Sequence, residues 1–521
     1  MHPCLAINEI LSNVFAHLFE HASTTEDDWT EYSQTTITLA ALARTCRTFT
    51  EPALDHLWEV QVVFAPLVQC MPADLWHIDP ATATLKFIRE IRDTDWDRFD
   101  FYARRVREMG RPYNGAMKPS TIREVDSDAL AALAVYRPAR LLLPHLQVLQ
   151  CTPWSKAILP VIHFVAGDSL RSVVLRKNDF LQADNHINAL ELSSFLLALS
   201  YRSTSLTSLS IFFPSFWETR DDGCLQLLSR LPKLRHITIS PIFYDDHRDL
   251  VEALARLPSL EELFWPNVKL EDLALYTTYG GRFPQLRAFG FYTSEAAFVG
   301  PVLSSMQREF SQISVTGLPI YLNAPSQTAQ LDLTCLPTHP ARLTLTKIHI
   351  YMHLHLAPTI VVEGPGVAEV LAPLFALTNV REVTLELHEL IALTDAWFAD
   401  AANAWPALED LTLVTHSSLY PAATLAGLAH LARRCVQLGH VAMWLDARVV
   451  PAHEYTKSGC QSLSLDASPI ADPLAVVLAL CAMFPELDGV VGGERTWTCY
   501  PDAEMLEYDR GWMQVEQYIL E

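Results

Sequence analysis

Hydrophobic residues recur in one short pattern along most of the chain beyond residue 140. The pattern reads L-x-x-L-x-L, with copies irregularly spaced at roughly 22–36 residues. Its alternating end predicts a short β-strand with one buried face. The apolar positions are Leu146 and Leu149; Leu170, Val173 and Leu175; Leu206, Leu209 and Ile211; Leu234, Ile237 and Ile239; Leu260, Leu263 and Trp265; Leu286, Phe289 and Phe291; Phe310, Ile313 and Val315; Leu345, Ile348 and Ile350; Val380, Val383 and Leu385; Leu408, Leu411 and Leu413; Leu438, Val441 and Met443; Cys460, Leu463 and Leu465; and Leu487 and Val490.

Helical patterns lie between these predicted strands, in residues 191–200, 249–256, 367–375, 422–434 and 475–484. A single strand–helix unit cannot bury its apolar face, but stacked units make a continuous core. The repeats resemble degenerate leucine-rich repeats. We prefer this fold to a doubly wound sheet because no strand is followed by a Gly-rich phosphate-binding turn.

A different pattern opens the chain and predicts three short helices. Asn8 is a candidate N-cap for the first helix, and Pro52 is expected in the first turn of the third. The acidic, Ser/Thr-rich residues 20–35 predict a solvated loop between the first two helices. The apolar stripes consist of Ile7, Ile10, Leu11, Val14, Phe15 and Leu18; of Leu39, Leu42, Ala43 and Cys46; and of Ala53, Leu54, Leu57 and Trp58.

The same stretch resembles an F-box, particularly the F-box-like proteins of mushroom-type fungi. The matching order is I-x-E-I-L-x-x-x-F, followed by L-x-x-L-A-R-x-C-R-x-F-x-E-P-A-L-x-x-L-W. The resemblance implies docking on the Skp adaptor of a Skp–cullin–F-box ubiquitin ligase, and through it on a cullin. The implied adaptor-binding residues are Ile7, Ile10, Leu11, Phe15, Leu42, Leu54, Leu57 and Trp58. The family usually has Pro where this chain has Asn8, and the insert at residues 20–35 could crowd an adaptor.

Residues 81–109 are expected to be helical and to connect the bundle to the repeats. Thr94 is a candidate N-cap, and the apolar face carries Trp96, Phe99, Ala103 and Val106. The arginines Arg98, Arg104, Arg105 and Arg107 are interspersed with acids, which favours a solvated face over an anion site. Residues 316–342 predict a loop or irregular repeat. The tail from Pro501 is a candidate cap, with Trp512, Val515 and Ile519 on one helical face.

We therefore expect an α/β protein, in which a three-helix F-box-like bundle precedes an irregular solenoid of short parallel strands and helices. The expected domains are residues 1–60 for the bundle, 61–140 for a helical connector, 141–500 for the solenoid and 501–521 for the C-terminal cap. The alternative is a leucine-rich-repeat scaffold or receptor whose N-terminal helices only cap the array.

Charge and cysteine content narrow the classes of partner. The net charge of −22 argues against nucleic acid or an anionic membrane as the main partner. The ten cysteines are scattered without a C-x-x-C pair, and no signal peptide or membrane-spanning run is present, so the cytoplasm or nucleus is expected.

The positions between the buried ones of each strand predict a concave face that binds an unknown target protein. Its candidate anchors are aromatic: Phe212, Phe264, Tyr292, His349, Tyr351 and Trp444. Charged and polar positions complete this face: Glu262, Lys347, Glu382, Glu386, Asp410, His440 and Asp466. A metal site at His349, His353 and His355 lacks further ligands nearby in sequence. No catalytic signature is present, so we expect neither an enzyme nor a cofactor; an enzyme with a cleft between the repeats and the tail is the weakest alternative.

Overall fold

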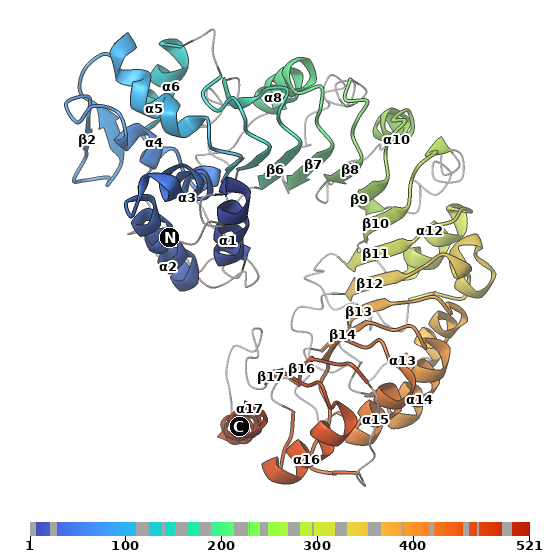
Figure 1. The fold of residues 1–521 in the computed structure, drawn as a ribbon. Helices are drawn as coiled ribbons and strands as arrows, with labels where there is room; N and C mark the ends of the chain where they lie inside the picture. The colour runs from blue at the N-terminus through green and yellow to red at the C-terminus, as the bar shows by residue number, and fades with distance from the viewer. Residues whose placement is uncertain are drawn as a thin grey trace. The chain divides into compact units, whose positions relative to one another are not determined.

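The computed structural model forms two compact units, residues 1–260 and 261–521. Figure 1 shows helices and parallel strands in each unit. The residues described are 7–20, 29–110, 124–137, 141–151, 164–176, 189–212, 228, 230–239, 248–268, 282–293, 296–317, 331–352, 366–387, 390, 392–415, 421–451, 458–465, 468–491 and 503–520.

The first unit opens with three helices: α1 (Asn8–Glu20), α2 (Trp29–Ala43) and α3 (Arg47–Glu59). A connector follows, with β1 (Val60–Gln61), α4 (Ala65–Gln69), β2 (Trp76–Ile78), β3 (Leu85–Phe87), η2 (Asp93–Asp95), α5 (Trp96–Ala103), β4 (Glu108–Met109) and α6 (Ser127–Val135). The remaining elements are β5 (Val148–Cys151), β6 (Ser172–Arg176), α8 (Ala189–Arg202), β7 (Ser208–Phe212), β8 (His236–Ile239) and α10 (Arg248–Ala255).

One parallel ladder organises this unit, in the order β1, β4, β5, β6, β7 and β8. The register aligns Leu149, Val173, Leu209 and Ile237, and all four are buried. Equivalent positions of successive repeats therefore meet in one apolar row. The predicted alternation is confirmed in β7, where buried and half-buried residues alternate.

The second unit continues the same construction. Its strands are β9 (Glu262–Val268), β10 (Ala288–Thr293), β11 (Gln312–Gly317), β12 (Lys347–Met352), β13 (Glu382–Glu386), β14 (Asp410–Val414), β15 (His440–Ala442), β16 (Ser462–Ser464) and β17 (Gly489–Val491). Its helices are η8 (Ala296–Phe298), α12 (Val299–Ser305), η10 (Leu336–Thr338), η11 (Pro340–Leu343), α13 (Val367–Leu371), η12 (Ala372–Ala376), α14 (Asp395–Ala404), α15 (Leu425–Arg434), α16 (Pro473–Met483) and α17 (Ala503–Leu520).

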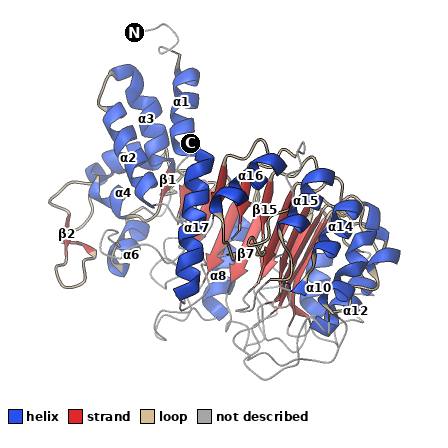
Figure 2. Cartoon of the chain, turned by 90° about the horizontal axis from the view of Figure 1, so that it is seen from below, coloured by secondary structure: helices blue, strands red, loops and turns tan. Residues whose placement is uncertain are grey.

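Strands β9 to β17 pair in sequence order, and every pair is parallel. Helices α12 to α15 lie along one side of these strands (Figures 1 and 2). Each repeat predicted from the sequence contains a strand, from β5 to β17, so the leucine-rich-repeat solenoid is confirmed. The central buried row consists of Leu263, Phe289, Ile313, Ile348, Val383, Leu411, Val441, Leu463 and Val490.

Helix α17 covers the last strand of the second unit. It packs against α16 and β17, with Trp512 and Val515 fully buried and Ile519 half-buried. The Trp512 indole N–H donates to the carbonyl of Ser468 at 2.8 Å, which satisfies a buried polar group. The tail therefore closes an apolar end that a repeat array would otherwise leave open.

Several expectations for the first unit were wrong. Residues 29–35 are not a loop, because α2 already starts at Trp29; residues 21–28 lie outside the described part. Helix α3 starts at Arg47, so Pro52 lies inside it, where its missing N–H removes a single backbone bond. Asn8 is the first helical residue of α1 rather than its cap, since the Leu11 N–H bonds the Ile7 carbonyl.

The connector is also less helical than expected. Only α5 and the short η2 are helical within residues 81–109, where β3 and β4 are strands. Gly110 ends β4 at a φ of +83°, and a Cβ there would overlap the carbonyl oxygen of Gln150. Two-residue strands such as β4 are too short to leave a periodic signal.

Adjacent repeats of the second unit are joined at the start of α15. Asp395, at the start of α14, accepts hydrogen bonds from the Thr424 N–H and hydroxyl and from the Gly427 N–H, all at 2.8–2.9 Å. A Cβ on Gly427 would lie 2.7 Å from the Asp395 carboxylate and 3.1 Å from the Phe398 ring. Asp395 thus caps the helix of the following repeat.

We predict that Asp395→Ala lowers the free energy of unfolding by about 1–2 kcal/mol, because three donors at the start of α15 lose their acceptor. Thermal and urea unfolding of the full chain would measure this. Asp400 is exposed on α14, the helix that begins with Asp395, so Asp400→Ala should change the free energy of unfolding little. Equal losses in both variants would contradict the capping role.

The irregular segment before β12 is organised around a buried histidine, His339. Its Nε2 lies 3.2 Å from the Leu303 carbonyl and 3.1 Å from the Met306 carbonyl, and the Ala341 N–H donates to Nδ1 at 3.0 Å. These partners require a neutral ring with its hydrogen on Nε2. Burial lowers the pKa of His339 below its usual value of 6.5.

The sign of the pH dependence follows from this lowered pKa. Below a pH of about 6.5, His339 binds a proton in the unfolded chain but stays neutral in the folded chain. The free energy of unfolding therefore falls as the pH is lowered, until the pKa of His339 in the folded chain is reached. We predict that His339→Gln narrows the difference in melting temperature between about pH 7.5 and about pH 5.5. His145→Gln, an exposed control, should leave that difference unchanged.

Candidate functional site

The three N-terminal helices pack around one small apolar cluster. Leu11, Phe15, Leu39 and Ala53 are its buried members, with Leu42, Ala43, Phe49 and Leu57 packed against them. The rings of Phe15 and Phe49 meet edge to face at 5.7 Å. Four residues of the predicted adaptor-binding set, Leu11, Phe15, Leu42 and Leu57, therefore pack in the bundle's own core.

The other side of α1 is exposed. Ile7, Ile10 and Val14 are spaced three and four residues apart, so they share one face, and their exposed fractions are 46%, 38% and 46%. Ile37 on α2 is 67% exposed. We call Ile7, Ile10, Val14 and Ile37 the outer apolar set. Of these four residues, only Ile7 and Ile10 belong to the adaptor-binding set predicted from the sequence. The helical period could have added Val14, but the exposure of Ile37 depends on how α2 packs.

Trp58 and Leu54, also predicted for the adaptor, are half-buried on α3. The Trp58 ring stacks on Tyr102 of α5 at 4.4 Å between centroids. Part of the surface expected for an adaptor is thus used to join the bundle to the connector.

A buried arginine strengthens the same junction. Arg105 is only 4% exposed, and its guanidinium bonds Glu51 at 2.6 Å and also Asp55, both on α3. The expectation of a solvated face for this arginine was wrong; its neighbour Arg104 is exposed and lies over the Phe101 ring. The chain turns after α5, so helical periodicity could not place Arg105.

We predict that Arg105→Ala loosens the bundle from α5, because the variant loses two charged hydrogen bonds, at a cost of about 2 kcal/mol. Hydrogen exchange should show faster opening of α3, with β9 to β17 unaffected. Arg104→Ala is the matched control and should leave exchange in α3 near that of the parent chain. Equal hydrogen-exchange rates of α3 in the two variants would contradict the proposed role of Arg105 in holding the bundle to α5.

The second unit presents a sheet face on the side opposite its helices, which we call the open face. On it the register aligns Lys347, Glu382, Asp410 and His440 in one row, and His349, Thr384, Thr412 and Ala442 in the next. Tyr351, Glu386 and Val414 form a third row. These outward positions are those expected from the L-x-L pattern, because side chains alternate along a strand.

The predicted target-binding residues do not all meet. Phe264 and Tyr292 are in ring contact at 4.7 Å, and Phe264 lies over Gly290, where a Cβ would be 2.4 Å from its ring. His349 and Tyr351 form a second ring pair at 6.2 Å. Phe212 belongs to the first unit, on β7. Asp466 lies outside the described residues.

Glu382 is the most strongly bonded carboxylate of the open face. Lys347 lies 2.6 Å and His349 Nε2 lies 2.7 Å from its two oxygens. Burial acts to raise the pKa of Glu382, but the bonds from Lys347 and His349 outweigh it and hold the pKa below its usual value. His349 is thus bonded to Glu382, a partner 33 residues away that sequence spacing could not reveal.

No group of three or more His, Cys, Asp or Glu side chains suited to a metal ion occurs among the described residues. His353 and His355, the other members of the H-x-H metal hypothesis, lie outside them. Within the part of the chain that the structure covers, no helix combines the length and apolar character needed to cross a lipid bilayer.

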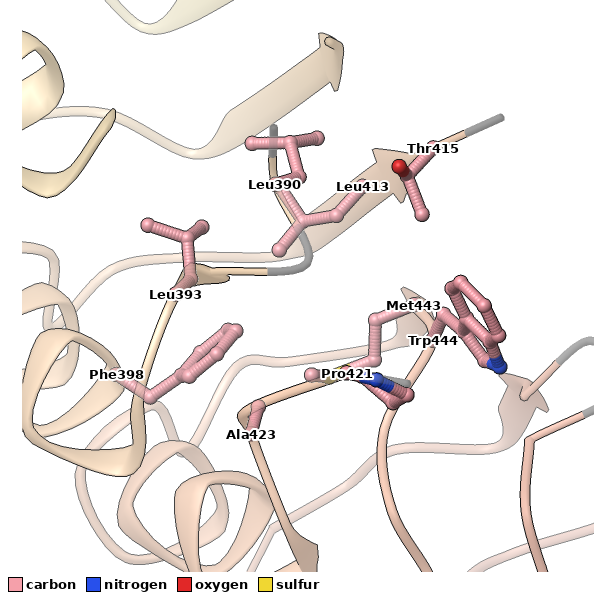
Figure 3. Close-up of a pocket in the computed structure, with 9 residues that line it drawn as sticks. All are labelled: Leu390, Leu393, Phe398, Leu413, Thr415, Pro421, Ala423, Met443 and Trp444. Carbon is pink, nitrogen blue, oxygen red and sulfur yellow. The ribbon is translucent and has the colours of Figure 1, made fainter. Parts of the chain in front are cut away.

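Trp444 lies at a small apolar pocket beside the ends of β14 and β15 (Figure 3). The pocket encloses about 270 Å³ of empty space counted out to its mouth, yet it has room inside for only about one water molecule. Its lining consists of Leu390, Leu393, Phe398, Leu413, Thr415, Pro421, Ala423, Met443 and Trp444. A drug-sized ligand does not fit a site of this size.

No family model and no curated protein matches the sequence. Among solved structures, the chain is similar to the leucine-rich-repeat-containing protein LegL7 from Legionella pneumophila, at 13% identity over 68% of this chain and 94% of that one, with a TM-score of 0.34. It is similar to a chain of the yeast Rad7 and Elc1 complex, at 14% identity over 72% and 87%, with a TM-score of 0.41. A third similarity is to the TLR13–ssRNA13 complex, at 13% identity and a TM-score of 0.34, with 67% of this chain matching 50% of that one.

Proposed function

We propose that the chain is a substrate-recruiting subunit of a Skp–cullin–F-box ubiquitin ligase. The N-terminal bundle would bind a Skp adaptor and, through it, a cullin, and the open face of the repeat array would hold a target protein. The observation that carries the proposal is the outer apolar set on a bundle whose own core is already filled. Exposed apolar side chains gathered on one small module are typical of a protein-binding surface.

The junction to the repeats suits this role. Helix α3 continues without a break into β1, whose pairing with β4 starts the parallel ladder of the first unit. Trp58 and Arg105 add a ring stack and two ion pairs to the same junction. In this proposal the chain contributes proximity rather than catalysis, because it would hold a target near a separate ligase core.

The alternative function is a non-catalytic scaffold whose helices only cap the array, and the direct continuation of α3 into β1 also favours it. Deleting residues 1–60 does not separate the two functions cleanly, since it also removes Val60 from β1. Substitutions on the outer apolar set avoid this damage.

We predict that Ile7→Ser together with Ile10→Ser weakens binding to a purified fungal Skp adaptor about thirtyfold, or about 2 kcal/mol, because two exposed anchors are lost. Surface plasmon resonance with the full chain would measure this. The melting temperature should stay unchanged, whereas Leu11→Ala should lower it by emptying the bundle core.

Leu478→Ser on α16 is the control, because Leu478 is 52% exposed and belongs to the other unit. It should bind the adaptor like the parent chain. Absence of binding by the parent chain, or equal binding by the Ile7/Ile10 variant, would favour the capping scaffold.

A further inference from the structure

Two arginines of the first unit occupy equivalent positions at the strand-start edge of its ladder. Arg107 directly precedes β4 and Arg171 directly precedes β6, and the same row contains Gln147 before β5 and Thr207 before β7. Backbone hydrogen bonds of 2.7–2.8 Å connect each member of this row to the next. We call these four residues the edge row. The strand spacing of a sheet puts its two arginines about 9.6 Å apart.

Both guanidinium groups are held in the same way. Arg107 donates to the carbonyl of His145 at 3.4 Å. Arg171 donates to the carbonyl of Ser205, also at 3.4 Å, and to that of Asp168 at 2.8 Å. His145 and Ser205 both lie two residues before the next member of the edge row, so the two forks are placed equivalently. Their acceptors are neutral, and the five N–H groups of a guanidinium exceed these bonds, so each arginine keeps its charge and donors for an anion.

The second unit neutralises an arginine at the equivalent position. Arg381 directly precedes β13, and Glu409 is the next member of its row, because the Glu409 N–H bonds the Arg381 carbonyl at 2.7 Å. The two side chains form an ion pair at 2.8 Å. In the first unit the members of the edge row that follow the arginines are neutral, so the row itself supplies no such counter-charge.

Acidic side chains near the edge row are few. Glu59 precedes Arg107 along the ladder, but its carboxylate lies 3.3 Å from His56 Nδ1. In the described turns that precede β4 to β8, the exposed Asp168 supplies the only carboxylate; these turns are residues 104–107, 141–147, 166–171, 203–207 and 230–235. Positive charge therefore predominates at this edge, although the whole chain has a net charge of −22.

Further cations lie in the turn before β8. Arg230 is exposed, lies over the Tyr201 ring at 5.3 Å from its centroid and donates to the Tyr201 hydroxyl at 2.7 Å. Its printed partners are thus an aromatic ring and a neutral hydroxyl, as the partners of Arg171 are neutral carbonyls. Lys233 is exposed in the same turn. These residues extend the positive surface beyond the edge row.

We propose that the edge row binds an extended acidic segment of a partner protein, with carboxylates three residues apart facing Arg107 and Arg171. Three residues of extended chain span about 10 Å, which matches the spacing of the two arginines. A carboxylate pairs with a guanidinium through two parallel hydrogen bonds, so the arrangement selects both charge and spacing. This surface goes beyond the proposed function, because it is separate from the outer apolar set and from the open face.

The charge of the whole chain favours a short acidic segment over nucleic acid. At an ionic strength of about 0.15 M, charges act over about 8 Å, so the arginines dominate the field at the edge row itself. A DNA duplex carries one charge per about 1.7 Å and extends far past two arginines, toward the rest of a chain with a net charge of −22.

The test uses fluorescence anisotropy with the full chain and labelled twelve-residue peptides on a Gly/Ser background. One peptide has four Glu residues, each three positions from the next, and a second has the four Glu residues in succession. Two others have Gln or Lys in place of the spaced Glu. We expect the spaced Glu peptide to bind about tenfold more tightly than the clustered one, and the Gln and Lys peptides not to bind. A single-stranded oligonucleotide of the same net charge should bind more weakly than the spaced Glu peptide.

Variants assign the binding to the edge row. Arg107→Gln and Arg171→Gln should each weaken binding of the spaced Glu peptide about tenfold, because a charged hydrogen-bond donor is lost. Gln147→Glu should weaken it by a similar factor with both arginines in place, because it adds the counter-charge that the second unit has. Arg381→Gln and Gln461→Glu make the same substitutions in the corresponding row of the second unit and should leave binding unchanged. Melting curves check that each variant is folded.

Equal affinity for the Glu and Gln peptides would overturn the proposal, as would equal losses in Arg171→Gln and Arg381→Gln. Tighter binding of the oligonucleotide than of the spaced Glu peptide would also overturn it and indicate a nucleic-acid partner. The assay contains no adaptor, so its failure would leave the proposed function standing, and a failure of adaptor binding would not affect this result.

Discussion

The structure depends on one constraint: no strand–helix repeat of this chain can bury its own apolar face. The parallel register meets this constraint by placing equivalent residues of successive repeats side by side, as in the row from Leu263 to Val490. An array built in this way has apolar ends that need a cover. In the second unit α17 covers β17 with Trp512, and in the first unit α3 leads into the edge strand β1.

The N-terminal bundle divides its few apolar residues between two uses. Leu11 and Phe15 fill the core, while Ile7, Ile10 and Val14 stay exposed on the other side of the same helix. A three-helix module buries little apolar surface of its own. Its attachment to the connector through Trp58 and Arg105 therefore contributes to its stability. The proposed adaptor contact would bury the remaining stripe.

The polar side chains of the second unit also fall into two groups. Polar side chains such as the half-buried Asp395 and the buried His339 hold neighbouring repeats together through hydrogen bonds to backbone groups. On the open face, by contrast, Glu382 is the bonded centre of a cluster, and Asp410 next to it bonds only a neutral hydroxyl within the described chain.

The sequence by itself determined the repeat architecture, because the L-x-x-L-x-L period reports strand burial directly and each predicted repeat contains a strand. It also identified the helical bundle and the outward-facing residues of the open face. Only the tertiary structure decided that α2 extends to Trp29, that Arg105 is buried against α3, and that His349 bonds Glu382. The last two features join residues about 30 to 50 positions apart, and local periodicity carries no information on such contacts. Which apolar residues of the bundle face inward was likewise decided by packing, since Leu11 and Ile10 are adjacent in sequence and equally hydrophobic, yet only one is buried.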